Sequence, residues 1–524
     1  MTWNPTDRPW HHSWPEGVPF TLDYTPEPAW RLMERNLAAR ADRVAVRHID
    51  HRTGSELRSW SYAEMWAFAG AVAGQLSSLG VARGDRVALR LPNGIELISS
   101  LYGAWLAGAA AVPGDSMASQ PELRHQLEDS GARVLLCREQ DRATSLEASA
   151  GLDVAIHAPC LDARPLSAPR EVEPERDLAV LMYTGGTTGT PKGAALTHRN
   201  ITVNVEQFAT WYQLENAEER CVSVLPMFHS GGMAGALNVP LARGAELLLM
   251  ERFNPKVVAR TVERYRATRL FGVPTMYLRI LDDDQARQAD FSSLRACRTS
   301  AAPLPPAVKE QFDELVGHEV LVEGYGLSEA SPLTHANPIL RPRAGSIGLP
   351  LPDTDARIVD DSGREMPAGQ PGELLIRGPQ IMAGYWNRPA ETASALQEGW
   401  LRTGDVASMD DDGYFRIVDR KKESIISGGY KIWPREVEDV LYQHPAVKMD
   451  AVVGVPDPSR GEMVKAYVVL HEDAPDVSSE DIRSFAHERL APYKVPRAVE
   501  FVKDIPVSPQ GKVLRRELRG RESR

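Results

Sequence analysis

Hydrophobic residues in the first 170 positions alternate between two spacings. Apolar residues recur at helical intervals in 63–78 and 121–130, whereas short uninterrupted apolar runs fill 86–91 and 133–137. Helix patterns that alternate with buried-strand patterns are typical of α/β domains with parallel sheets. A longer, weakly polar run, 97–113, contains serines and glycines, so it predicts a core helix leading into a strand rather than a membrane span.

The same rhythm resumes after a connector rich in proline, alanine and charged residues, 162–177. Residues 178–348 predict further βα units, with strands at 178–182, 246–250 and 319–322. Between 354 and 377 the apolar period shortens to two, and turn-forming residues interrupt it twice. This stretch therefore predicts a β-rich subdomain.

The last hundred residues form a separate pattern. Two helix patterns lie among strand patterns; the helices are expected at 434–442 and 479–490, and the strands at 414–418, 447–455 and 464–471. A chain of 524 residues exceeds what one core usually holds. We therefore expect a large N-terminal α/β domain of several subdomains, 1–420, and a small α+β C-terminal domain, 421–524. The charged tail after Arg515 is expected to be frayed beyond its last helical turn, and to be a solvated end rather than a binding arm.

Composition and charge narrow the class of protein. The net charge of −11 leaves no basic surface suited to nucleic acid. The four cysteines stand far apart without metal-ligand spacing, which predicts buried, reduced side chains at Cys137, Cys160, Cys221 and Cys297. No signal-peptide pattern is visible at the N-terminus, so we expect a cytoplasmic protein without an integral membrane span. Contact with a membrane surface and a homodimer both stay open.

Residues 183–193 carry the clearest chemical signal. They read Tyr-Thr-Gly-Gly-Thr-Thr-Gly-Thr-Pro-Lys-Gly, with four glycines, four threonines and one lysine directly after a buried-strand pattern. Glycines let backbone amides approach a ligand closely, and successive amides form a concavity that binds anions. Hydroxyl groups and an ammonium group strengthen such a phosphate site. We therefore predict that this loop binds phosphate.

The loop differs from the common nucleotide P-loop, in which lysine stands between a glycine and a hydroxyl residue. Here Lys192 follows Pro191 and precedes Gly193. The other Gly-Lys pair ends in Lys512 and is followed by Val513, and no Rossmann fingerprint follows an expected strand. The phosphate site must therefore have a different architecture.

Further motifs follow this loop in a fixed order along the chain. They are Pro-Met-Phe-His-Ser-Gly-Gly at 226–232, Ser-Ala-Ala-Pro-Leu at 300–304, Gly-Tyr-Gly-Leu-Ser-Glu at 324–329, Thr-Gly-Asp at 403–405, Asp-Arg-Lys-Lys-Glu at 419–423, Ser-Gly-Gly-Tyr at 427–430 and Pro-Gln-Gly-Lys at 509–512. Together with the phosphate loop, the set closely resembles the adenylate-forming superfamily. That superfamily includes acyl-CoA synthetases, adenylation domains of nonribosomal peptide synthetases, and beetle luciferases.

The resemblance implies an ATP and Mg²⁺ site. Glu329, assisted by Thr184, would bind the metal ion, Tyr325 would stack on adenine, and Asp405 would accept the ribose hydroxyls. The implied ATP-binding residues are Thr184, Gly185, Gly186, Thr187, Thr188, Gly189, Lys192, Ala302, Gly324, Tyr325, Gly326, Ser328, Asp405, Arg420, Lys422 and Lys512.

It also implies a moving lid. Lys512 would bridge the substrate carboxylate and the α-phosphate in the first half-reaction. The small domain would then rotate at a hinge near Lys422, and a segment containing Gly428, Gly429 and Tyr430 would line a channel for coenzyme A (CoA). The implied catalytic residues are Lys512, Lys192, His229 and Glu329.

The implied acyl pocket consists of His229, Val273, Ser300, Ala301, Gly326 and Leu333. Most of these residues are small or apolar, and no basic residue stands among those after His229 to pair with a second substrate charge. The segment 235–238, Gly-Ala-Leu-Asn, has no carboxylate to bind the ammonium group of an amino acid. This composition weighs against amino-acid adenylation.

The resemblance therefore implies an acyl-CoA synthetase that converts a carboxylic acid, ATP and CoA into acyl-CoA, AMP and pyrophosphate. The opening segment 8–19 resembles bacterial medium- and long-chain fatty acid ligases, which makes a fatty acid the expected substrate. An aryl or alicyclic acid is the alternative. Loading of a carrier protein, a luciferase-like oxidase and a non-catalytic nucleotide sensor are further alternatives.

Overall fold

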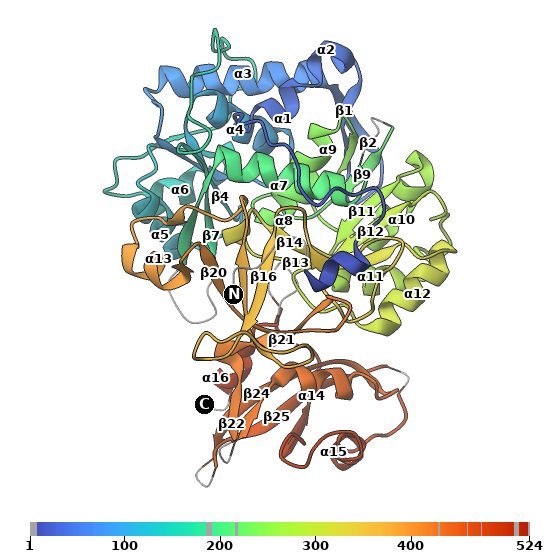
Figure 1. Cartoon of the computed structure of the whole chain (residues 1–524). Helices are drawn as coiled ribbons and strands as arrows, with labels where there is room; N and C mark the ends of the chain where they lie inside the picture. Colours follow the sequence, from blue (N-terminus) through green and yellow to red (C-terminus); the bar gives the residue numbers. More distant parts are fainter. Residues whose placement is uncertain are drawn as a thin grey trace.

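The computed structural model describes residues 8–184, 191–214, 218–427, 430–457, 460–472, 474–507 and 513–521. Within these residues the chain forms a large domain of two α/β layers and a β-rich layer, with a smaller C-terminal unit beside it (Figure 1). The expectation of a large α/β domain followed by a small α+β domain is confirmed.

The first α/β sheet is mostly parallel. In spatial order its described strands are β15 (Leu349–Pro350), β14 (Leu333–Ala336), β13 (Leu321–Gly326), β12 (Ala296–Thr299), β11 (Arg269–Gly272), β9 (Arg220–Ser223), β10 (Glu246–Leu249), β1 (Val44–Ile49) and β2 (Glu56–Ser61). The strands from β1 to β13 run parallel, and antiparallel strands close both edges.

The second α/β sheet contains the two strands that flank the predicted phosphate loop. Its described strands, in spatial order, are β18 (Gly384–Tyr385), β8 (Lys192–Thr197), β7 (Leu178–Thr184), β4 (Ala110–Gly114), β3 (Arg86–Arg90), β5 (Val134–Cys137) and β6 (Ala155–His157). Strands β7 and β8 pair antiparallel, whereas β4, β3, β5 and β6 follow β7 in parallel. The phosphate loop therefore joins two hairpin strands, unlike a P-loop, which joins a strand to a helix.

Helices cover both sheets. In the large domain they are α1 (Arg31–Glu34), α2 (Leu37–Arg40), α3 (Tyr62–Ser78), α4 (Ile95–Leu106), α5 (Gln120–Ser130), α6 (Arg142–Ala148), α7 (His198–Trp211), α8 (Ser230–Met233), α9 (Val239–Ala242), α10 (Pro255–Tyr265), α11 (Pro274–Leu281), α12 (Pro306–Val316) and α13 (Pro389–Ala395), with short turns η1 (Pro9–Ser13), η2 (Glu139–Asp141), η3 (Ala234–Asn238) and η4 (Ser328–Ala330).

Local sequence explains several helix boundaries. Ser61 and Glu64 form a reciprocal capping box at the start of α3, and Thr197 and Asn200 do the same for α7. The weakly polar run 97–113 forms most of α4 and of the strand β4, as predicted. Nearly every residue of α4 is buried, which explains why its pattern is apolar on all faces.

The β-rich subdomain and the small unit follow each other directly. The subdomain contains β16 (Asp355–Val359), β17 (Gly372–Arg377), β20 (Trp400–Met409), β19 (Leu396–Gln397) and β21 (Phe415–Arg420). After η5 (Lys421–Glu423), a separate sheet contains β23 (Tyr430–Ile432), β22 (Ile425–Ser427), β25 (Gly461–Leu470), β24 (Val447–Asp457) and β26 (Ala498–Phe501), packed with α14 (Pro434–Leu441), α15 (Ser479–His487) and α16 (Arg515–Arg521).

The C-terminal tail is not the solvated end that was expected. Residues Arg515–Arg521 form α16, which packs against β24 of the small domain, and residues 522–524 lie outside the described residues. Leu518 is fully buried, and Arg515 pairs with Glu423 at 2.5 Å and with Glu438 at 2.7 Å. The prediction weighed the charge of the tail and overlooked that one buried leucine and two carboxylate partners would order it.

The cysteines are free, and three of them are buried: Cys137, Cys221 and Cys297. Burial raises the pKa of the Cys221 thiol to about 12 and raises that of the Cys297 thiol well above its ordinary value. Among the described residues, no helix combines the length and the apolar character that a membrane span requires.

Candidate ATP and acyl site

The base of the phosphate loop is well defined. Thr184 and Lys192 stand opposite each other at the ends of β7 and β8, and the Thr184 hydroxyl donates to the Lys192 carbonyl at 3.4 Å. Five of the predicted phosphate-binding residues lie outside the described residues: Gly185, Gly186, Thr187, Thr188 and Gly189. Lys192 therefore stands where the loop ends and the chain re-enters the sheet.

A tyrosine that sequence reasoning missed connects Lys192 to Glu329. The ammonium of Lys192 lies 5.2 Å from the centre of the Tyr385 ring, and the Tyr385 hydroxyl donates to Glu329 at 2.8 Å. Burial and the Glu329 charge raise the pKa of Tyr385 above its ordinary value, so the hydroxyl keeps its proton. Nothing in the local sequence identifies Tyr385, because β18 reaches β8 only in the folded chain.

Glu329 belongs to η4, which follows β13. In the same turn, the Ser328 hydroxyl lies 3.1 Å from that of Ser230, at the start of α8. The preceding residue, His229, packs its ring against Phe228 with 4.2 Å between ring centres. The structure thus brings the predicted residues His229, Ser328 and Glu329 onto two adjacent turns.

The predicted nucleoside residues form a hydrogen-bonded cluster. The Tyr325 hydroxyl donates to one carboxylate oxygen of Asp405 at 2.5 Å, and Nε of Arg420 lies 3.2 Å from the other oxygen. Asp405 is 5% exposed, and its charge raises the pKa of Arg420 further. The three side chains come from β13, β20 and β21, so the cluster joins two sheets.

Tyr325 stands between two glycines, and the backbone packs closely around them. A Cβ atom on Gly326 would lie 2.1 Å from the carbonyl oxygen of Pro332, a distance that side-chain atoms do not tolerate. Gly324 has more room, since a Cβ there would meet its nearest atom at 3.3 Å. The predicted residue Ala302 lies in the loop after β12, half-buried, two residues before Leu304.

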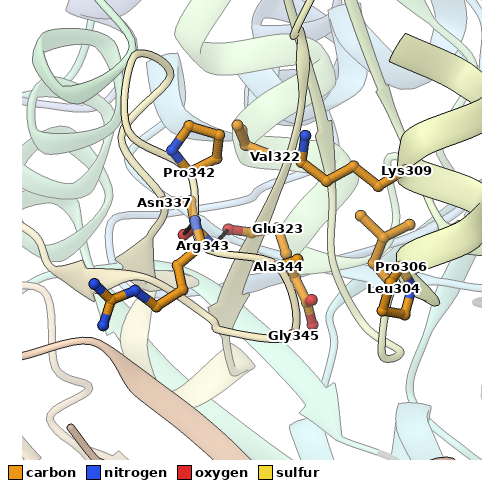
Figure 2. A pocket seen from close by; sticks show the side chains of 10 residues that line it. All are labelled: Leu304, Pro306, Lys309, Val322, Glu323, Asn337, Pro342, Arg343, Ala344 and Gly345. Carbon is orange, nitrogen blue, oxygen red and sulfur yellow. Dashed lines mark hydrogen bonds between the residues drawn. The ribbon is translucent and has the colours of Figure 1, made fainter. Parts of the chain in front are cut away.

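A pocket adjoins these segments (Figure 2). Glu323, the residue before Gly324, lies at its centre between Asn337 and the Leu304–Pro306 side. The Asn337 side chain donates to the Glu323 carbonyl at 3.0 Å, but one carboxylate oxygen of Glu323 is buried without a partner among the described residues. Burial raises the pKa of Glu323 to about 7.

The predicted acyl residues lie at the carboxyl edge of the first sheet. Val273 and Ser300 follow β11 and β12, Leu333 begins β14, and Ala301 has a left-handed backbone with φ of +74°. Ligands of parallel α/β sheets commonly bind at this edge. Arg298, a basic residue outside the predicted set, donates to the Ser300 hydroxyl at 3.0 Å.

Most of the predicted thiol channel lies outside the described residues. Gly428, Gly429 and Lys512 lie outside the described residues, and the backbone of Lys422 belongs to η5. Tyr430 is 56% exposed, and its ring stacks on Tyr493 of the small domain at 4.5 Å. This stacking keeps Tyr430 on the small domain in the arrangement observed.

Glu329 fits a magnesium site that ATP completes. Among the described residues, no group of three or more His, Cys, Asp or Glu side chains could enclose a metal ion. Mg²⁺ typically takes one or two protein carboxylates and completes its shell with phosphate oxygens and water. When bound, the ion would neutralise phosphate charge beside Glu329.

Comparisons with known proteins agree with this geometry. The family model for AMP-binding enzymes matches residues 33–386, and the model for their C-terminal domain matches residues 436–512. The long-chain-fatty-acid–CoA ligase of Bacillus subtilis (strain 168) is 37% identical, covering 98% of both chains. Feruloyl-CoA synthase of an Amycolatopsis species is 39% identical over 94% of this chain and 98% of its own.

A solved structure also matches closely. ATP-bound MatB from Rhodopseudomonas palustris superposes with a TM-score of 0.86 and 29% identity, over 94% of this chain and 99% of the other. The fold and site define an ATP-dependent, adenylate-forming acid–CoA ligase. The chain belongs to the AMP-binding enzyme family, and its activity requires ATP, Mg²⁺ and CoA.

Removing the Tyr385 hydroxyl tests the connection to Glu329. Tyr385→Phe keeps the ring beneath Lys192 but deletes the donor that orients the carboxylate, so the Mg²⁺ concentration for half-maximal activity should rise roughly tenfold. The matched control is Tyr265→Phe, which removes another Tyr–Glu bond, between the end of α10 and the edge strand β2 of the first sheet. An unchanged Mg²⁺ titration for Tyr385→Phe would exclude this role.

Glu323→Gln tests the buried carboxyl. The folded-state pKa of about 7 lies above the ordinary value, so the contribution of Glu323 to stability is full below pH 4.5 and is lost as the pH rises through 7. The variant should therefore be more stable than the parent at pH 8.5, by on the order of 2 kcal/mol, and similar at pH 5. Thermal unfolding at both pH values measures this, with the exposed Glu310→Gln as control; equal shifts in both variants would contradict it.

Proposed function

We propose that this ligase first forms an acyl-adenylate from a carboxylic acid and ATP, and that CoA then displaces AMP from it. The observation that carries the proposal is the convergence of Lys192, Glu329 and the Tyr325–Asp405–Arg420 cluster from segments far apart in the chain. Each group has a partner that fixes its position. Catalysis of this kind rests on positioning and on preorganised charge.

The cations of the site suit formation of an acyl-adenylate. A carboxylate must approach a triphosphate of the same sign, so cations near the phosphates lower the barrier. Lys192 would hold the terminal phosphates, Arg420 the ribose side, and Lys512 the α-phosphate and the attacking carboxylate. Asp405 would accept the ribose hydroxyls, since a carboxylate offers two oxygen acceptors.

We propose further that the domains divide near Lys422 and that the small domain rotates between the half-reactions. In support, β21 ends the β-rich sheet at Arg420, and β22 begins a separate sheet at Ile425. Rotation would bring the segment containing Gly428, Gly429 and Tyr430 toward the adenylate. A hinge needs only a few residues whose backbone angles can change.

For the acid substrate, an aryl or other polar-substituted acid is the first candidate. The interior behind Ser300 contains the rings of Phe208 and Phe271 and the guanidinium of Arg298. A relative named feruloyl-CoA synthase is consistent with this choice. A medium- or long-chain fatty acid is the second candidate, favoured by the relative named long-chain-fatty-acid–CoA ligase and by the apolar Val273 and Leu333.

A panel of carboxylic acids tests the proposal. Fatty acids, benzoic and cinnamic acids and alicyclic acids would each be supplied with ATP and Mg²⁺, with and without CoA. The expected result is acid-dependent release of pyrophosphate, and release of AMP that needs CoA. If every acid fails to release pyrophosphate, the proposed function is wrong.

Lys512→Ala separates the two half-reactions. Loss of the ammonium that stabilises the first transition state should slow pyrophosphate release by at least about 100-fold, while thioester formation from synthetic acyl-AMP stays near the parental rate. Lys503→Ala, an exposed lysine of the small domain, is the control and should change neither rate. An equal loss in both half-reactions would contradict the assigned role of Lys512.

A further inference from the structure

Arg298 lies in the interior of the first sheet, in the middle of β12. Its neighbours in register are Phe271 on β11 and Val322 on β13, and all three belong to the face that packs toward α7. Arg298 is 3% exposed. A guanidinium at such a position is unusual, because arginine is rarely buried without a partner.

The hydrogen-bonding capacity of Arg298 is mostly unused. It donates to the Ser300 hydroxyl, whereas its Nε and Nη1 atoms are buried without a partner among the described residues. No carboxylate of the described chain forms an ion pair with it, and burial lowers its pKa. The charge is therefore held in the protein without a counter-ion.

Other buried arginines of the described chain are satisfied differently. Arg269, on the neighbouring strand β11, is 4% exposed and forms two hydrogen bonds with Glu219, at 2.8 and 3.2 Å. Arg8 pairs with Asp355, and Arg90 donates to three oxygen atoms. The described chain thus supplies oxygen partners for these three buried arginines but leaves most of the Arg298 guanidinium without one.

The space around Arg298 combines aromatic walls with a second unused polar group. The guanidinium lies 4.7 Å from the centre of the Phe208 ring and 6.0 Å from that of Phe271. The hydroxyl of Tyr212 is also buried without a partner, and a Cβ on Gly324 would lie 3.5 Å from it. Position 324 therefore lies directly beside that hydroxyl.

The position of Arg298 relates it to the acyl pocket. Ser300, a predicted pocket residue, accepts its hydrogen bond, and the Cα of Arg298 lies about 6–7 Å further into the sheet because each strand residue advances about 3.3 Å. A substrate whose reacting carboxyl lies at the edge of the sheet would extend inward toward this guanidinium. The end of the acid remote from the reaction would then meet Arg298.

We propose that Arg298 determines substrate specificity by binding an oxygen acceptor at the remote end of the acid. This inference rests on the proposed function. A carboxylate is bound most strongly, since it neutralises the buried charge, and a hydroxyl or keto oxygen on an aromatic ring is bound less strongly. An acid that ends in methyl leaves the guanidinium unpaired, so the enzyme discriminates against it.

Matched pairs of acids test this specificity. Benzoic acids with a para carboxylate, hydroxyl or methyl group, and aliphatic dicarboxylic and monocarboxylic acids of equal length, are compared by kcat/KM for pyrophosphate release. The parent enzyme should prefer the acceptor-bearing member of a pair by on the order of 100-fold or more. Arg298→Met should abolish that preference without changing the KM for ATP, and Arg298→Lys should retain part of it for carboxylates.

Stability measurements separate this role from a structural one. Arg298→Met removes an unpaired buried charge, so its Tm should equal or exceed that of the parent. The matched control Arg269→Met breaks a buried ion pair, so it should lower the Tm and leave the preference unchanged. A lower Tm for Arg298→Met with equal loss of activity on all acids would overturn the proposal.

Two further results bear on the proposal. If the parent enzyme releases pyrophosphate only with acids that end in methyl, the role of Arg298 is wrong while the proposed function stands. If no acid supports pyrophosphate release, the proposed function and the role of Arg298 are both wrong.

Discussion

The hydrogen bond between Tyr325 and Asp405 is the contact on which the site depends. It joins β13 of the first α/β sheet to β20 of the β-rich sheet, and Arg420 on β21 completes it. Arg420 is also the last residue before the connection to the small domain. The groups expected to hold the nucleoside therefore also tie two sheets of the large domain together, next to the connection at which the small domain is proposed to rotate.

Much of the fold could be predicted from the sequence because its signals are local. Apolar spacing identified α3, α5 and the pair α4–β4, and ordered glycine-rich motifs identified the segments that carry Lys192, Tyr325 and Asp405. Tyr385 and Arg298 could not be predicted from the sequence, because their roles come from neighbours in the folded chain and neither residue belongs to a distinctive motif. The order of α16 escaped because a buried Leu518 is inconspicuous among charges.

The protein and the ATP that it binds both carry a net negative charge. A protein with a net charge of −11 binds a polyanion only if its cations are placed locally and held there. Lys192 is positioned by an aromatic ring, and Arg420 by a buried carboxylate. Arg298 is positioned by one serine and two phenylalanine rings, with no acid to neutralise it. Lys192 and Arg420 suit the phosphates and the ribose of ATP, and Arg298 remains to bind the acid substrate.

The buried cysteines have a consequence for chemical selectivity. An acyl-adenylate is a mixed anhydride that any thiolate nearby could attack. Cys297 lies next to Arg298 in the chain, yet its burial, like that of Cys221, keeps the sulfur protonated at neutral pH. These two thiols are therefore poor nucleophiles toward an activated acyl group, which favours the sulfur of CoA as the acceptor.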